Sequence, residues 1–411
     1  MNMLCCRSCG AELHQVFMDL GASPLSNRYL SAEDLLVMEP TYPLKSHVCT
    51  QCWLVQLPAV VTPEQLFSDY PYFSSYSDSW LKHSEAYVES ITKQLGLTSA
   101  HHVVEIASND GYLLQYFAQR GIPVHGVEPA ANVAAEAEAK GIPTLVRFFG
   151  TRTAEDMAAA GLKADLLLGN NVLAHVPDLN DFIAGMELLL NPGGVITMEF
   201  PHLLRLMELN QFDTIYHEHF SYFSFLAVEQ AFLRHGLELF DVEELPAHGG
   251  SLRIYGRHLA DASEPVGPRV VELRQREVSL GLDHADAYER FTRQVEETKR
   301  GLLTFLIDAK RSGKSIVGYG APAKGNTLLN YCGIRTDFLD YTVDRSKHKQ
   351  GRYLPGSRIP VFSPDRIKET KPDFVLVLPW NLREEIMDQM AHIRDWGGRF
   401  VLPIPRVEVL P

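Results

Sequence analysis

Short apolar runs alternate with amphipathic stretches through the middle of the 411-residue chain. The amphipathic stretches, such as residues 79–95 and 132–140, predict helices because their apolar positions recur at helical spacing. The apolar runs predict buried strands at 103–107, 123–128, 164–169 and 194–200. This alternation favours an α/β fold with a doubly wound parallel sheet.

The pattern changes near residue 227. A helix predicted at 227–235 is followed by two strands, 237–245 and 251–256, with a short Pro- and Gly-containing loop between them. A plain dinucleotide-binding dehydrogenase domain would continue instead with more strand–helix units. The hairpin resembles the ending of a class I methyltransferase (Rossmann-like) domain.

A second α/β pattern follows. One long polar helical region is expected at 270–311, and strands are expected at 315–320, 338–344, 373–378 and 399–403. We therefore divide the chain into an N-terminal metal-binding segment at 1–78, a central sheet domain at 79–258 and a smaller Rossmann-like domain at 259–411.

Charge and composition narrow the function classes. The formal net charge is −13, which argues against nucleic acid as the main partner because phosphate backbones need a basic surface. No run of about 18 apolar residues is present, so no membrane span is expected. The N-terminus has no apolar signal-peptide region. We expect a cytoplasmic protein, and its ordinary composition is compatible with a monomer.

Four of the six cysteines form two C-x-x-C pairs, Cys6/Cys9 and Cys49/Cys52. Four thiolates supply a closed tetrahedral shell for Zn²⁺ and leave no open position, so the predicted role is structural. Cys5 could replace Cys6 in a C-x₃-C pair. Free buried cysteines or a single redox pair are the alternatives.

The turn after the first predicted strand has the features of a nucleoside-cofactor site. Its candidate contacts are Glu105, Ala107, Asn109, Gly111, Tyr112 and Leu113. It lacks the three glycines that cradle a pyrophosphate, which disfavours NAD and favours S-adenosylmethionine. Glu128 ends the second strand, where an acidic side chain can accept both ribose hydroxyls. Asn170 and Asn171 end a later strand and could shape the pocket; a generic strand–helix turn is the plainer alternative.

The densest polar cluster lies at 213–223. It contains Tyr216, His217, Glu218, His219 and Tyr222, and His175 follows the preceding strand at the same predicted edge of the sheet. Histidine is a base near pH 7, and Tyr or a second His can stabilise an enolate, so this set suits proton abstraction beside a carbonyl. A metal site and ordinary loop histidines are alternatives, although the zincin spacing is absent.

A third loop, 318–326, combines small residues with Lys324 and Asn326 after a predicted strand. Backbone N–H groups and a lysine at such a turn can bind a phosphate or diphosphate, and Asp344 could contact a sugar hydroxyl. A purely structural turn remains the alternative. Tyr70 and Tyr72 lie at the first domain boundary, where they could cover a cleft or pack an interface.

Taken in order, the cysteine pairs, residues 105–111, Tyr216-His217-Glu218-His219, His248-Gly249-Gly250-Ser251 and the 318–325 loop resemble the sugar C-methyltransferases of antibiotic deoxysugar pathways. Within this family the chain resembles the C-3′-methyltransferases of D-tetronitrose biosynthesis, and the similarity to the family spans essentially its whole length. This resemblance implies an N-terminal zinc-binding domain, a central S-adenosylmethionine domain and a C-terminal nucleotide-sugar-binding domain.

The resemblance also implies the reaction. The substrate would be a thymidine-diphosphate (dTDP)-linked 4-keto-deoxysugar, with a 3-amino group favoured, methylated at C-3′ through an enolate. His219 would be the base, oriented or tuned by Glu218. Tyr216 and His175 would stabilise the enolate, and Tyr70 would position the sugar. The other substrate contacts would be Tyr72, Tyr222, Lys324, Asn326 and Asp344.

Three other functions fit parts of the sequence. An NAD(P)-dependent oxidoreductase acting on nucleotide sugars would use both α/β domains. A zinc hydrolase would use the His/Glu cluster, and a zinc-ribbon scaffold would need neither His175 nor His219. The glycine-poor first turn weighs against the oxidoreductase, and the second cysteine pair weighs against the hydrolase.

Overall fold

Two compact units share the chain, and each unit is built from three separate segments. The structure is a computed structural model that describes residues 4–62, 73–261 and 265–411. The first unit consists of Met1–His14, Cys49–His202 and Phe220–Asp283, and the second of Gln15–Val48, Leu203–His219 and His284–Pro411. The predicted division into three consecutive domains, with boundaries after residues 78 and 258, stays a prediction about which part of the chain has which function.

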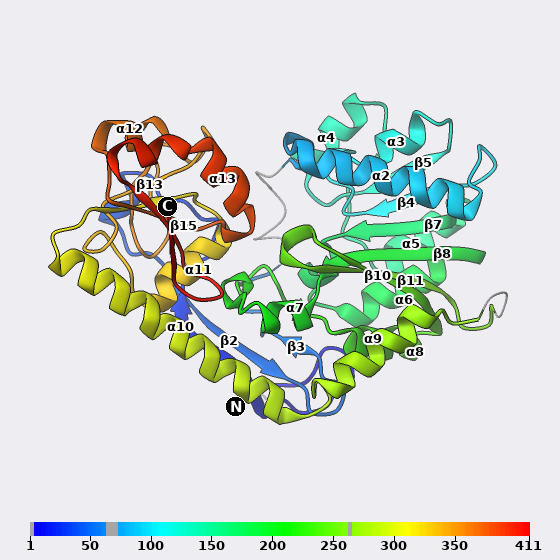
Figure 1. Cartoon of the computed structure of the whole chain (residues 1–411). Helices are drawn as coiled ribbons and strands as arrows, with labels where there is room; N and C mark the ends of the chain where they lie inside the picture. The colour runs from blue at the N-terminus through cyan, green and yellow to red at the C-terminus, as the bar shows by residue number, and fades with distance from the viewer. Residues whose placement is uncertain (1–3, 63–72, 262–264) are drawn as a thin grey trace. The chain divides into compact units, whose positions relative to one another are not determined.

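The first unit contains a seven-stranded sheet with the order β10-β11-β8-β7-β4-β5-β6 (Figure 1). Strands β8, β7, β4, β5 and β6 run parallel, while β11 pairs antiparallel with β8 and with β10. The predicted parallel sheet and its terminal hairpin are therefore confirmed. The strands are β4 (Val103–Ile106), β5 (Val124–Val127), β6 (Thr144–Leu145), β7 (Ala164–Asn170), β8 (Leu190–Pro201), β10 (Leu237–Leu245) and β11 (Ser251–His258).

Both faces of this sheet are buried because alternate strand residues point to opposite sides. In β7, Leu166 and Leu168 join a core with α2 and α3, whereas Leu167 joins a core with α5, α6 and α8. Burial on both sides explains why the parallel strands read as continuous apolar runs. The helices of this unit are α2 (Asp78–Leu95), α3 (Leu114–Ala118), α4 (Ala131–Ala139), α5 (Thr151–Ala159), α6 (Leu179–Leu189), α8 (Phe225–Arg234) and α9 (Pro268–Ser279).

The second unit contains a six-stranded sheet with the order β14-β13-β12-β15-β16-β17. It also holds the antiparallel hairpin of β1 (Gln15–Ser23) and β2 (Tyr42–Val48), which packs on the long helix α10: the ring of Phe17 stacks on Phe291 at 5.2 Å. Its remaining strands and helices are α7 (Leu203–Glu208), α10 (Ala285–Arg311), β12 (Ile316–Tyr319), α11 (Ala323–Cys332), β13 (Thr342–Val343), β14 (Val361–Phe362), α12 (Asp365–Thr370), β15 (Phe374–Val377), α13 (Arg383–Gln389), β16 (Arg399–Leu402) and β17 (Glu408–Leu410).

Two predicted elements differ from the structure. The region 270–311 is two helices, α9 and α10, because the chain turns after Ser279 with Gly281 at φ +80°, a conformation that suits glycine. The strand expected at 338–344 shortens to Thr342–Val343, since only these residues pair with β12 and β14. Among the helices in the described part of the chain, none has the length and apolar content that crossing a membrane requires.

Candidate active site and metal centre

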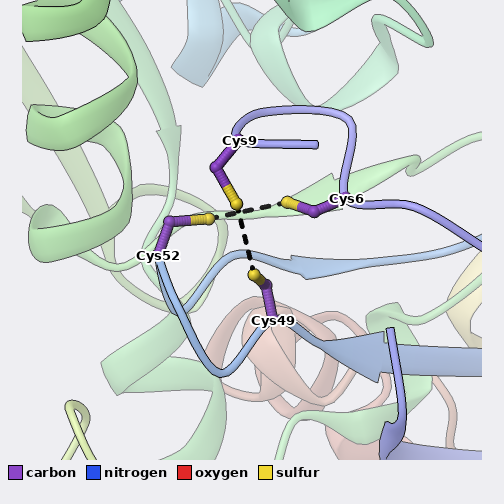
Figure 2. A group of neighbouring side chains, drawn as sticks. All are labelled: Cys6, Cys9, Cys49 and Cys52. Carbon is purple, nitrogen blue, oxygen red and sulfur yellow. Dashed lines mark hydrogen bonds between the residues drawn. The ribbon is translucent and has the colours of Figure 1, made fainter. Parts of the chain in front are cut away.

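Four cysteines converge in the first unit (Figure 2). The Sγ atoms of Cys6 and Cys52 lie 3.5 Å apart, as do those of Cys9 and Cys49, and all four lie within 4.8 Å of one another. Four sulfurs at about 2.3 Å from one tetrahedral Zn²⁺ would lie about 3.8 Å apart, so the cluster fits the ion. Cys5 is exposed and lies outside the cluster, so Cys6 rather than Cys5 is the metal ligand.

The backbone around each pair forms the turn that brings two thiols together. The N–H of Gly10 donates to the Cys6 carbonyl, and the N–H of Trp53 donates to the Cys49 carbonyl. Contacts with Cys49 and Cys6, together with burial, raise the pKa of the Cys52 thiol. Four neighbouring thiolates would repel one another, and a bound Zn²⁺ would neutralise their charge.

The first cysteine loop is tied to the segment that carries His175. The Arg7 guanidinium donates to the carbonyls of Val176 (3.5 Å) and Pro177 (3.3 Å), and Asn180 donates to the Arg7 carbonyl at 3.0 Å. His175 ends the short 3-10 helix η3 (Leu173–His175) just before these residues. The metal centre thus stabilises the loop after β7 as well as its own strands.

The turn after β4 has an unusual backbone. Ala107 and Asn109 have φ of +56° and +50°, although neither is glycine, and Gly111 has φ of +73°. Non-glycine residues with positive φ occur more often at ligand-binding sites. The turn packs against Gly126 of β5, where a Cβ atom would lie 2.3 Å from the Ser108 hydroxyl. Small residues here let the backbone approach a ligand closely.

Three carboxyl groups gather at this turn. Burial raises the pKa of Glu105 well above its usual value, and the negative charges of Asp110 and Glu128 add to the rise. Such a cluster favours a cationic ligand and disfavours a pyrophosphate. S-adenosylmethionine carries a sulfonium and an ammonium group, so the acid set fits it. The buried Tyr112 and Leu113 continue the turn into α3.

Glu128 is placed to hold hydroxyl groups. Its Oε2 accepts the Asn109 N–H at 3.0 Å and its Oε1 accepts the Ala130 N–H at 2.9 Å. Each oxygen keeps a second lone pair that can accept a ribose hydroxyl. The carboxylate is thereby fixed in orientation before any ligand binds.

We expect Glu128→Gln to raise the Kd for S-adenosylmethionine about tenfold or more, since an amide NH₂ would face one of the two backbone N–H groups and a charged acceptor is lost. Titration calorimetry measures the change. Glu138→Gln, at an exposed position on the following helix α4, is the matched control and should bind normally. Equal affinity for both variants would remove Glu128 from the cofactor site.

Sequence reasoning missed a polar cluster at the ends of β8 and β11. Glu199 bonds to His83 at 2.9 Å and to Arg253 at 2.6 Å. Trp80 and His83, on α2, stack at 4.9 Å, and the Arg253 guanidinium lies 4.3 Å from the Tyr87 ring. The spacing of Trp80, His83 and Tyr87 along one helix face was the available signal.

The remaining predicted residues of this unit lie near these groups or on β9. The Asn170 amide donates weakly to the Tyr112 hydroxyl at 3.5 Å. Asn171 has φ of +55°, and its amide lies 3.0 Å from Nε2 of His248, in the loop before β11. Tyr222 is buried in β9 (Ser221–Tyr222), which pairs antiparallel with β3 (Val55–Gln56). Tyr70 and Tyr72 lie outside the described residues.

His219 belongs to the second unit, in the segment 203–219. Its Nδ1 lies 2.8 Å from the Thr214 carbonyl, which can only accept, so the proton of the neutral ring is on Nδ1. The lone pair is then on Nε2, as a general base requires. The Tyr216 ring lies 4.1 Å from the His219 ring and can stabilise an imidazolium through its face.

The neighbours of His219 have different surroundings. His217 is buried, its Nε2 donates to the Pro43 carbonyl at 3.2 Å, and burial lowers its pKa, so it is a neutral packing residue. Glu218 accepts a 2.7 Å hydrogen bond from Asn27, and burial raises its pKa to about 7. The group bonded to His219 Nδ1 is the Thr214 carbonyl, and the tuning role of Glu218 stays a prediction.

Glu218 makes the native state sensitive to pH. Its pKa is raised from about 4.3 in the unfolded chain, so the native state binds the proton more tightly and loses stability as pH rises from about 4.5 to 7. We expect Glu218→Gln, whose amide oxygen can still accept from Asn27, to match the wild type at pH 5 and to be more stable at pH 8, by up to about 3 kcal/mol. Calorimetric Tm values at the two pH values test this. Glu384→Gln, at an exposed carboxyl, should show no such gain, and equal behaviour of the two variants would contradict the prediction.

The expected loop at 318–326 is instead the end of β12, a short turn at 320–322 and the start of α11, which carries Lys324 and Asn326, and Asp344 organises the turn. Its Oδ2 accepts the Ala321 N–H and its Oδ1 accepts the Ser346 N–H, each at 2.8 Å. Lys349, which sequence reasoning missed, donates to the Ala321 carbonyl at 2.9 Å and lies 3.7 Å from Asp344. Lys324 is half-buried and donates to Asn381. Asn326 is buried and donates to the Ser26 carbonyl at 2.6 Å, so its substrate role stays a prediction.

Comparison with known proteins agrees with these features. Residues 6–67 match the family described as "Putative zinc binding domain", residues 80–242 match "Methyltransferase domain", and residues 246–405 match "C-methyltransferase C-terminal domain". The chain is 37% identical to the C-methyltransferase NovU of Streptomyces niveus over 98% of its own length and 96% of that protein.

Other likenesses cover less of the chain. The ubiquinone biosynthesis O-methyltransferase of Rhizobium etli strain CIAT 652 is 32% identical over 23% of this chain and 38% of that protein. The crystal structure of an S-adenosylmethionine-dependent methyltransferase from Clostridium acetobutylicum matches 43% of this chain and 92% of its own, at 10% identity and a TM-score of 0.34. With three matched domains in order and a relative that spans nearly its whole length, the chain belongs to the C-methyltransferase family, whose members combine a zinc-binding domain with S-adenosylmethionine-dependent methyl transfer.

Proposed function

We propose that this C-methyltransferase methylates C-3′ of a dTDP-linked 4-keto-deoxysugar during antibiotic sugar biosynthesis, in the cytoplasm. Similarity to NovU along nearly the whole chain supports carbon as the methyl acceptor. The observation that carries the proposal is the hydrogen bond from His219 Nδ1 to the Thr214 carbonyl, because it places the ring proton on Nδ1 and the basic lone pair on Nε2. Cysteines arranged to bind a metal rather than to pair as disulfides suit a reducing compartment.

Carbon methylation needs a carbanion, and a ketone supplies one only after a proton leaves the neighbouring carbon. In the proposed reaction His219 Nε2 removes the C-3′ proton, and the negative charge moves to the C-4′ oxygen. Tyr216 stabilises the imidazolium and, with His175, the enolate. Tyr70 positions the sugar.

The bound S-adenosylmethionine would supply an electrophilic methyl group on sulfur. Glu128 would hold its ribose, the backbone at Ala107, Asn109 and Gly111 would lie against it, and the Glu105 carboxyl would favour its positive charge. Asn170 and Asn171, at the end of β7, would border the methyl-transfer position.

Nucleotide binding is assigned to the second unit and two tyrosines. Lys324 supplies positive charge to a diphosphate in a chain of net charge −13. Lys349 adds a second cation beside the Ala321 carbonyl, and Asp344 shapes the loop between them. Tyr72 and Tyr222 complete the proposed substrate contacts.

Two measurements test the proposal. Mass spectrometry after incubation with S-adenosylmethionine and dTDP-4-ketosugars, with and without a 3-amino group, should show one added methyl on carbon and release of S-adenosylhomocysteine. The matched 4-hydroxy sugars, which cannot form an enolate, should gain no methyl. Methylation of the 4-hydroxy sugars, or none of the ketosugars despite cofactor binding, would overturn the substrate assignment.

A further inference from the structure

Asp213 is a buried carboxyl that the proposed reaction does not use. It lies in the short 3-10 helix η4 (Phe212–Thr214) and has no solvent exposure. Its Oδ2 accepts the indole N–H of Trp380 at 2.8 Å. Its Oδ1 is buried without a hydrogen-bond partner among the residues that the structure describes. Burying a carboxyl oxygen without a hydrogen-bond partner costs free energy of folding. The presence of Asp213 at this position therefore calls for a functional explanation.

The same indole also contacts Lys324, in the first turn of α11. The Lys324 ammonium lies 4.4 Å from the centre of the Trp380 ring, a cation–π distance. Burial raises the pKa of Asp213 to about 7, and the charge of Lys324 opposes that rise. Asp213, Trp380 and Lys324 therefore form one interacting group, with a carboxyl at one end and the proposed diphosphate-binding cation at the other.

This group adjoins the carbonyl that orients the base. Thr214, the next residue after Asp213, accepts the Nδ1 proton of His219 at 2.8 Å. The carbonyl of the next residue, Ile215, accepts a 3.1 Å hydrogen bond from the hydroxyl of Thr327, which lies in the same helix as Lys324. The carbonyls of Thr214 and Ile215 are thus both held by hydrogen bonds, directly beside the buried Asp213.

We propose that Asp213 is a positioning residue for methyl transfer: by holding the Trp380 indole and the Lys324 ammonium against the 212–214 turn, it fixes the Thr214 carbonyl and with it the tautomer of His219. The inference rests on the proposed role of His219 as the base. Asp213 touches no reacting atom, so its loss should lower kcat much more than it changes cofactor affinity.

Asp213→Asn and Trp380→Phe test the two halves of the contact while preserving side-chain shape. We expect kcat to fall about tenfold in each, with the Kd for S-adenosylmethionine within about twofold of wild type. Nitrogen-15 NMR of histidine-labelled enzyme, with the His219 signals assigned from the His219→Asn spectrum, should show a loss of the Nδ1–H tautomer in both variants.

Trp396→Phe is the matched control. This tryptophan also donates its indole N–H to a buried segment of the second unit, the Pro372 carbonyl at 3.0 Å, but it has no contact with the 212–219 segment in the described contacts. It should leave kcat and the His219 signals unchanged. An equal fall of kcat in the control, or an unchanged His219 tautomer in Asp213→Asn, would overturn the positioning role while leaving His219 as the base. Full methylation by His219→Asn would instead overturn the proposed base, whatever the NMR signals show.

Discussion

Replacing His219 by Asn should lower kcat by about 10²–10⁴-fold, the usual contribution of a general base, and leave the Kd for S-adenosylmethionine close to wild type. Asn is the informative substitution because its amide N–H can still donate to the Thr214 carbonyl, as Nδ1 of His219 does. The variant therefore keeps this hydrogen bond but loses the Nε2 lone pair and the ring contact with Tyr216.

Deuterium exchange separates the two chemical steps. In D₂O without the methyl donor, the wild-type enzyme should exchange the C-3′ proton of the ketosugar, and His219→Asn should not. His217→Gln is the control, since the Gln amide can replace the donor to the Pro43 carbonyl and this neighbouring ring has a packing role. Exchange that persists in His219→Asn would assign the base to another residue, with His175 the first candidate.

Cys6→Ser should abolish tight zinc binding, lower the zinc content from one ion per chain to near none, and lower Tm by on the order of 10 °C. The reason is geometric: Cys6 lies within 4.8 Å of the other three sulfurs in a buried cluster, so a hydroxyl there opens the shell. Metal analysis and calorimetry measure both effects.

Cys5→Ser provides the matched control one residue away. Cys5 is exposed and outside the cluster, so zinc content and Tm should not change. Loss of zinc in Cys5→Ser with retention in Cys6→Ser would exchange the ligand assignment. We also expect lower turnover in Cys6→Ser, because the cysteine loop positions Arg7 against the segment after His175.

Local signals made much of the fold predictable. The two cysteines of each C-x-x-C pair are separated by only two residues, so each pair is visible in the sequence. Strands β4 and β7 are buried on both faces, so each forms an apolar run that can be identified without knowing which strands it pairs with. The turn at 105–111 was predictable because its acidic, small and glycine residues directly follow the apolar strand in the sequence. Its positive φ angles at Ala107 and Asn109 were not, since nothing in those residue types requires them.

Contacts between distant segments were out of reach. Asn27 bonds to Glu218 across 191 positions, and Trp380 bonds to Asp213 across 167. The orienting partner of His219 is a backbone carbonyl, which has no residue type to signal it. The break between α9 and α10 had a visible glycine, Gly281, but the polar pattern continues through it.

The interleaved segments have a consequence for biosynthesis. The β1–β2 hairpin at residues 15–48 leaves the ribosome long before α10, the helix it packs against, has been translated. At translation rates of about 5–20 residues per second, this delay amounts to roughly 10–50 s. During that time Phe17 and the other core residues of the hairpin have no partner helix to cover them, and chaperones can bind them. Fragments cut at residue 283 would prolong this exposure indefinitely, so the two units are expected to reach their native form only from an intact chain.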